Sequence, residues 1–135
     1  MTLKFQIKKN LNEAFEYLCN TDKFATVHPV IYRIEKLSDS KFQAYEKLKV
    51  GRWHFSFSYP FYLEINEAQK SVTMKAIVFG LTKLQLDFSL VQQGEYCHIT
   101  EQIQIKSLLP VKGIMMKMIP DLHGQLFKNI EKAER

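Results

Sequence analysis

Two carboxylates interrupt the apolar faces of their strands in this chain of 135 residues. Glu46 alternates with the apolar residues of the 41–50 segment, and Glu101 alternates with those of the 95–107 segment. A carboxylate on an apolar face is costly unless it is paired, protonated or in contact with water. Each is therefore a candidate for a polar anchor, or for a general acid/base with a raised pKa inside a cavity. The alternative is a bulge or strand end that turns the side chain outward.

The four histidines have no metal-ligand spacing, so no metal site is predicted. His54 and His98 fall in the polar phase of their strands and are expected at the surface. His123 is placed at the margin of the apolar stripe of the last helix. The sequence also lacks a G-x-S-x-G motif, a local Cys–His pair and a glycine-rich phosphate loop. No nucleophilic catalytic residue and no cofactor is predicted.

An aromatic strand is the second unusual feature. In RWHFSFSYPF, residues 52–61, aromatic rings occupy every second position. Such a stripe can be packed core, the wall of a ligand cavity, or a platform on which bases stack. Its members are Trp53, Phe55, Phe57, Tyr59 and Phe61.

Apolar periodicity gives the elements that must position these residues. Asn10 is an N-cap candidate, with Glu13 three residues later, for a short helix that ends near Cys19. A second helix or turn over 22–28 should end before Pro29, which disfavours helical geometry at the preceding residue. Strands are predicted at 3–8, 30–37, 41–50, 52–65, 71–79, 82–92 and 95–107. The last six follow one another through tight turns, which implies an antiparallel sheet with one buried face.

A long amphipathic helix is predicted over 111–133. Its apolar residues are spaced three or four apart. Pro120 should kink this helix or break it in two near Met116, because proline removes a backbone donor. Three methionines before the proline either fill the core or line a pocket that accepts varied apolar shapes. They are Met115, Met116 and Met118.

The order of these elements resembles the START-like or SRPBCC superfamily, whose helix-grip fold is shared by birch-pollen-type allergens and polyketide cyclase/dehydrase-like proteins. The resemblance covers the whole chain and rests on the opening strand with LNEAFEYLCN, on TVHPVIYRIEKL and on DLHGQLFKNIEKAE. It implies one α+β domain over 1–135, in which a curved seven-stranded antiparallel sheet wraps around a kinked C-terminal helix. It also implies an apolar cavity between them, with His28 near its mouth. The expected ligand contacts are Trp53, Phe55, Phe57, Tyr59, Glu46, Glu101, Met118, Leu122 and His28.

Composition narrows the classes of partner. The net charge is +5, but the lysines are scattered along the sequence and only three arginines are present, so no nucleic-acid partner is predicted. No apolar run is long enough for stable membrane insertion, and the N-terminus lacks the apolar core of a signal peptide. Cys19 and Cys97 are expected to be free thiols in a reducing, cytoplasmic compartment.

Three function classes remain open. The first is the binding or carriage of a small apolar molecule such as a lipid, an isoprenoid or an aromatic polyketide. The second is a cyclase or dehydratase in which Glu46 or Glu101 moves protons. The third is a protein-interaction module with a collapsed cavity.

Overall fold

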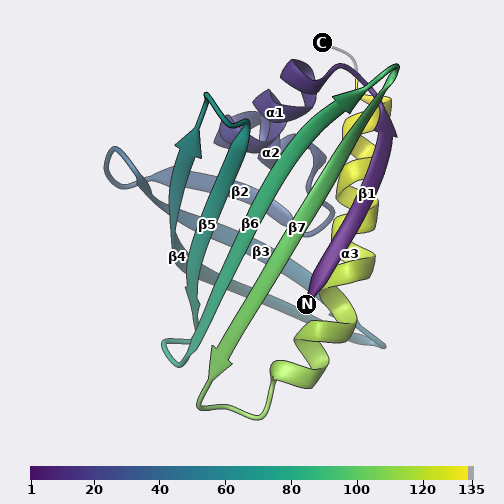
Figure 1. Cartoon of the computed structure of the whole chain (residues 1–135). Coiled ribbons are helices and arrows are strands. Elements are labelled where there is room, and N and C mark those ends of the chain that lie inside the picture. The colour runs from purple at the N-terminus through teal and green to yellow at the C-terminus, as the bar shows by residue number, and fades with distance from the viewer. Residues whose placement is uncertain (134–135) are drawn as a thin grey trace.

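The computed structural model describes residues 1–133, apart from the side chain of residue 50, and has the predicted α+β architecture. One sheet of seven strands curves around the C-terminal helix, with two short helices after the first strand (Figure 1). The helices are α1 (Leu11–Cys19), α2 (Thr21–Val27) and α3 (Lys112–Lys132). The strands are β1 (Thr2–Lys8), β2 (Ile31–Lys36), β3 (Lys41–Val50), β4 (Trp53–Asn66), β5 (Ser71–Val78), β6 (Thr82–Gln93) and β7 (Tyr96–Ser107).

The sheet is antiparallel throughout, and its strand order is β1-β7-β6-β5-β4-β3-β2. Strands β2 to β7 therefore form a meander, and β1 closes it by pairing with β7. The predicted strand phases are confirmed, because alternate residues of β5, β6 and β7 are buried. These residues form the sheet side of the core, with Phe88 and Ile99 almost fully covered.

The long helix α3 covers the inner face of the sheet. Leu126, Phe127 and Ile130 are completely or almost completely buried, and the Phe127 ring lies 4.7 Å from that of Phe5 in β1. Pro120 lies inside one continuous helix, so the predicted break in two does not occur. Figure 1 shows the first turns of α3 bending away from the axis of the rest. No helix in the described part of the chain is long and apolar enough to cross a membrane.

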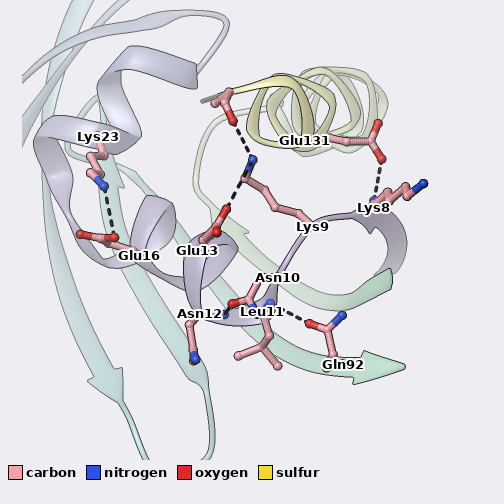
Figure 2. Close-up of polar contacts among 11 residues, drawn as sticks. Lys8, Lys9, Asn10, Leu11, Asn12, Glu13, Glu16, Lys23, Gln92 and Glu131 are labelled. Atoms are coloured by element: carbon pink, nitrogen blue, oxygen red, sulfur yellow. Dashed lines mark hydrogen bonds and ion pairs between the residues drawn. The ribbon is translucent and has the colours of Figure 1, made fainter. Parts of the chain in front are cut away.

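Polar contacts hold the start of α1 and the end of α3 near the junction between β1 and α1 (Figure 2). Asn10 caps α1 as predicted, since its side chain accepts a hydrogen bond from the backbone N–H of Asn12. Lys9 donates through Nζ to the carbonyl of Ala133 at 2.7 Å, and the backbone N–H of Lys8 donates to Glu131 at 2.7 Å. These bonds tie the C-terminal turn of α3 to the β1–α1 junction.

Helix α2 ends at Val27, before Pro29, as the sequence predicts. His28 is the C-cap residue, in an extended conformation that suits the residue before Pro29. Its backbone N–H bonds to the carbonyl of Phe24. The side chain of Asn129 in α3 donates to the carbonyl of Val27 at 2.8 Å, which holds α2 against the long helix. His28 is thus positioned between α2, β2 and α3.

Candidate functional site

A cavity of about 470 Å³ lies between the sheet, α2 and α3. Strands β3, β4, β5 and β6 supply one wall, and the first half of α3 supplies the other. Most of the lining side chains are apolar, and neither lysine nor arginine is among them. The lining residues that stay exposed mark where the cavity opens to solvent. They are Phe55, Ser56, Phe79 and Ile114.

Some aromatic side chains of this strand line the cavity, and one is exposed to solvent instead. Phe55, Phe57 and Tyr59 line the cavity as expected. Trp53 does not line it and is 69% exposed, which corrects the prediction for this residue. The reason lies in the pairing of β4, which meets β5 only from Phe61 onward. The first half of β4 therefore extends beyond β5, and Trp53 lies at its far end, beside the β3–β4 turn, where its ring stays in contact with solvent.

Three further candidates line the cavity, although His28 lies beside His123 in its inner part and not near its mouth as expected. Met118 and Leu122 face the cavity from α3, and His28 faces it from the end of α2. The Nδ1 atom of His28 accepts hydrogen bonds from the backbone N–H groups of Val30 and Ile31, at 3.1 and 2.9 Å. A nitrogen that accepts carries no proton, so the neutral ring has its proton on Nε2. Burial, together with nearby His123, lowers the pKa of His28 from 6.5 to about 3.

Glu46 lines the cavity and is paired with a tyrosine. The hydroxyl of Tyr59, on the neighbouring strand, donates a hydrogen bond to Oε2 of Glu46. Burial raises the pKa of Glu46, although the Tyr59 hydrogen bond and nearby His123 act in the opposite direction. Burial and the adjacent Glu46 raise the pKa of Tyr59 well above its usual value. Glu46 and Tyr59 thus form a hydrogen-bonded polar pair on a largely apolar wall, and their raised pKa values mean that both groups hold their protons more tightly than usual.

Glu101 points inward but does not line the cavity, which corrects that part of its prediction. It is completely buried beneath α3 and contacts His123, which is 7% exposed. The Nδ1 atom of His123 lies 2.8 Å from Oε1 and 2.6 Å from Oε2, and the hydrogen bond is directed at Oε1. Among the described residues, Oε2 finds no hydrogen bond of its own. The sheet and the helix are thus joined by a buried polar pair.

The sequence does not predict His123 as a site residue, because its position is interpreted as the margin of the apolar stripe of the long helix. It lines the cavity and lies beside His28, with ring centroids 6.4 Å apart. Its spacing could have indicated a buried position. His123 follows Ile119 by four residues and precedes Leu126 by three, which is the spacing of the buried side chains of α3. The inner part of the cavity therefore gathers His28, Glu46, Tyr59 and His123.

The remaining chemistry-bearing side chains do not join this cluster. Cys19 and Cys97 are free thiols, and burial raises their pKa values to about 12 and about 11. Within residues 1–133 no three histidine, cysteine or carboxylate side chains lie close enough together to hold a metal ion. The candidate site is therefore an apolar cavity with a small polar inner end.

No protein-family model matches the chain, and no curated protein matches it in sequence. Solved structures do match. A START superfamily protein from Mycobacterium smegmatis aligns with a TM-score of 0.78 at 15% identity, over 97% of this chain and 93% of that one. Major latex-like protein 151 from Panax ginseng aligns with a TM-score of 0.74 at 15% identity, over 97% and 93%.

The di-domain ARO/CYC protein BexL, from the BE-7585A biosynthetic pathway, aligns with a TM-score of 0.81 at 7% identity. That match covers 97% of this chain and 46% of BexL. The chain has a START/SRPBCC-like fold. The resemblance inferred from the sequence is therefore confirmed for the architecture. At 7% and 15% identity these matches establish the fold alone, and the START/SRPBCC-like cavity must be interpreted from its own residues.

Proposed function

We propose that this START/SRPBCC-like domain binds one small, uncharged apolar molecule in the cavity under α3. The observation that carries the proposal is an apolar space of about 470 Å³ with polar groups only at its inner end and its rim. Ligand cavities typically enclose roughly 300–1,000 Å³ and combine apolar walls with a few polar groups that fix orientation. A protein-interaction module with a collapsed cavity is disfavoured by the same space.

The inner end suits a hydroxyl or carbonyl group rather than an anion. His28 is neutral, with its proton on Nε2, and can donate to a ligand oxygen. Glu46 with its raised pKa can donate or accept, depending on its proton. A ligand carboxylate would instead meet Glu46 and the nearby buried Glu101 with no lysine or arginine in the lining to offset its charge. Burying an unpaired charge costs far more than burying a hydrogen-bonded neutral group.

The test compares ligands that share a tail and differ in the head group. A long-chain alcohol, the corresponding methyl ketone and the corresponding fatty acid are titrated against the protein loaded with the neutral probe N-phenyl-1-naphthylamine. We expect the alcohol and ketone to displace the probe and the fatty acid to bind at least tenfold more weakly. Equal displacement by the fatty acid would refute the uncharged head group.

A cavity-filling variant tests the location. Met118→Trp places a larger side chain in the lined space and should abolish probe binding while the far-ultraviolet circular dichroism stays unchanged. Asp121→Trp, on the same helix but at an exposed position, is the matched control and should bind as the wild type does. If both variants bind the probe equally, binding occurs outside the cavity.

Acid/base catalysis is the second candidate function, and the Glu101–His123 pair favours it. A buried carboxylate next to Nδ1 of a histidine orients the ring and leaves Nε2 available as a base. In the cavity, Nε2 would remove a proton from the carbon next to a ligand carbonyl, and His28 would donate to the resulting enolate oxygen. Deuterium exchange into the same methyl ketone, followed by NMR, tests this step. Exchange at the buffer rate, unaffected by His123→Gln, would reject it.

A further inference from the structure

The first half of β4 has a free backbone edge. Strand β3 pairs with all of residues 53–62, whereas β5 pairs with β4 only from Phe61 onward. Residues 53–59 therefore have a neighbouring strand on one side only. A row of unpaired N–H and C=O groups is a template on which another strand can pair. We refer to residues 53–59 as the open segment.

The register of β3 and β4 shows which backbone groups point outward. The N–H of Leu63 donates to the carbonyl of Ser40, on the β3 side, at 2.9 Å. The pairing continues from there through the open segment without a shift, so odd-numbered residues of β4 keep their backbone groups toward β3. The N–H and C=O groups of His54, Ser56 and Ser58 therefore point away from β3. Within the described residues, no hydrogen bond engages these three N–H groups.

The two outer edges of the sheet are protected against such pairing, but the open segment is not. The outer strands are β1 and β2. Strand β1 carries Lys4 and Lys8, and β2 is short, has a register shift and carries Arg33 and Glu35. Charges, bulges and short length are the usual means of blocking an edge. The open segment, WHFSFSY, contains no lysine, arginine, aspartate or glutamate, so its edge is available to a partner strand.

The open segment is complementary to a second copy of itself. In an antiparallel pairing centred on Ser56, Ser56 lies opposite Ser56 of the second copy, and His54 lies opposite Ser58. Every outward N–H group of both copies then finds a carbonyl acceptor. A shift in either direction would place one end of the segment opposite the β3–β4 turn or opposite Phe61, which β5 already pairs. The centred register is therefore the one that pairs the whole open segment.

The same register covers the exposed aromatic rings. Trp53 is 69% exposed and Phe55 is 51% exposed. Trp53 would lie opposite Tyr59 of the second copy, and Phe55 opposite Phe57, all on the inner face of the sheet. Aromatic pairs across neighbouring strands stabilise a sheet. Because Phe55 and Phe57 line the cavity, the second copy adds a ring to the wall at its opening.

We infer that this protein forms a reversible, two-fold symmetric dimer by antiparallel pairing of the open segments of two copies. The two sheets then form one continuous sheet, with the two cavity openings beside the shared strands. The inference goes beyond ligand binding, since the pairing needs no occupant in either cavity. It also gives a role to the part of the aromatic strand that extends past β5.

Charge and area set the strength of this pairing. Lys47 is the strand neighbour of Ser56, so the Lys47 residues of the two copies lie three strand spacings apart, about 14 Å. That separation exceeds the screening length of about 8–10 Å, and their repulsion is small. Covering the exposed parts of Trp53 and Phe55 in both copies removes on the order of 500 Å² from water. Stable interfaces bury about 1,200–2,000 Å². We therefore expect a dimer that dissociates on dilution.

Disulfide trapping tests the register. Opposite residues of a hydrogen-bonded antiparallel pair have Cα atoms about 5.5 Å apart, which a disulfide can span. Ser56→Cys, oxidised in air with copper phenanthroline, should give a covalent dimer on a non-reducing gel. Ser58→Cys is the matched control on the same edge, because its two copies would lie four residues apart along the strands, about 14 Å, and should stay monomeric. Equal cross-linking of the two variants, or none in either, would overturn the inference.

Sedimentation velocity from roughly 10 µM to 1 mM tests the dimer without a cross-link. We expect the dimer fraction of the wild type to rise with concentration. Ser56→Lys places two lysines opposite each other on the two-fold axis and should weaken dimerisation by about tenfold or more. Ser89→Lys, at an exposed position on the outer face of β6, is the matched control and should dimerise as the wild type does.

Circular dichroism establishes that both lysine variants are folded. A wild type that stays monomeric throughout this range, or equal weakening by the two lysine substitutions, would contradict the open-segment dimer. Probe displacement by dilute, monomeric protein tests the cavity independently, so the two proposals can fail separately.

Discussion

Acid should destabilise this protein through His28, and His28→Asn should remove that sensitivity. The Nδ1 atom of His28 accepts hydrogen bonds from the backbone N–H groups of Val30 and Ile31 at the start of β2. The side-chain oxygen of asparagine can take the place of Nδ1 as acceptor, but asparagine does not titrate. The substitution therefore keeps the local hydrogen bonding and deletes the protonation equilibrium.

The size of the effect follows from the pKa. Burial first, and nearby His123 second, lower the pKa of His28 from 6.5 to about 3. The unfolded chain then binds more protons than the folded chain below pH 6.5, so stability falls as the pH drops from 6.5 toward 3. Between neutral pH and about pH 5 the loss is about 2 kcal/mol for this one group.

Glu46 acts with the opposite sign over part of the same range. Its raised pKa means that the folded chain holds its proton more tightly, so lowering the pH favours folding through this group. Both the wild type and His28→Asn retain Glu46, and the difference between them therefore isolates His28.

The assay is urea denaturation at about pH 7.5 and pH 5, followed by circular dichroism, for the wild type and His28→Asn. We expect the wild type to lose about 2 kcal/mol more than the variant on acidification. Ring resonances of His28 in NMR spectra should report a neutral imidazole down to about pH 4, as follows from its lowered pKa. Equal pH dependence of the two proteins, or titration of the His28 ring near 6.5, would refute the reasoning.

Three further predictions concern buried groups. Glu101→Ala should lower the free energy of unfolding in urea by about 3–5 kcal/mol, because it leaves buried His123 without its hydrogen-bond partner. Glu101→Gln should lower this free energy by less. Leu126→Ala should cost about 2–5 kcal/mol, and Ile114→Ala, at an exposed position, less than about 0.5 kcal/mol in the same assay. Cys19 and Cys97 should resist iodoacetamide at pH 8 until the protein is unfolded, because their raised pKa values keep them protonated; rapid alkylation of the native protein would contradict this.

Most of the fold could be predicted because each element carries a local signal. Alternation of apolar residues marked the strands, and the Asn10 cap and Pro29 marked the limits of the short helices. These signals depend only on neighbours in the sequence. The structure accordingly departs from the predicted boundaries by no more than one residue at the element ends.

The site was less predictable because it depends on where strands end relative to one another. Trp53 and Tyr59 share one phase of β4, yet Trp53 is exposed and Tyr59 is buried. Tyr59 lies next to the part of β4 that pairs with β5, which begins at Phe61, whereas Trp53 lies at the far end of the unpaired part. No residue in the 52–65 segment reveals how far its neighbour extends. Likewise, Glu101 was identified as an inward carboxylate, but its partner lies on a helix 22 residues away. The pairing of Glu101 with His123 depends on how α3 is positioned along the sheet, which no local pattern in the sequence gives.

A ligand that enters the cavity polar end first meets the exposed lining residues before it reaches the inner end. Phe79 and Ile114 are exposed members of the lining, whereas His28 and Glu46 belong to its inner part. Along this apolar path an unpaired neutral hydroxyl costs about 1–3 kcal/mol, and an ionised carboxylate costs far more. Entry in this orientation therefore selects for the same uncharged head group that the inner end can bind.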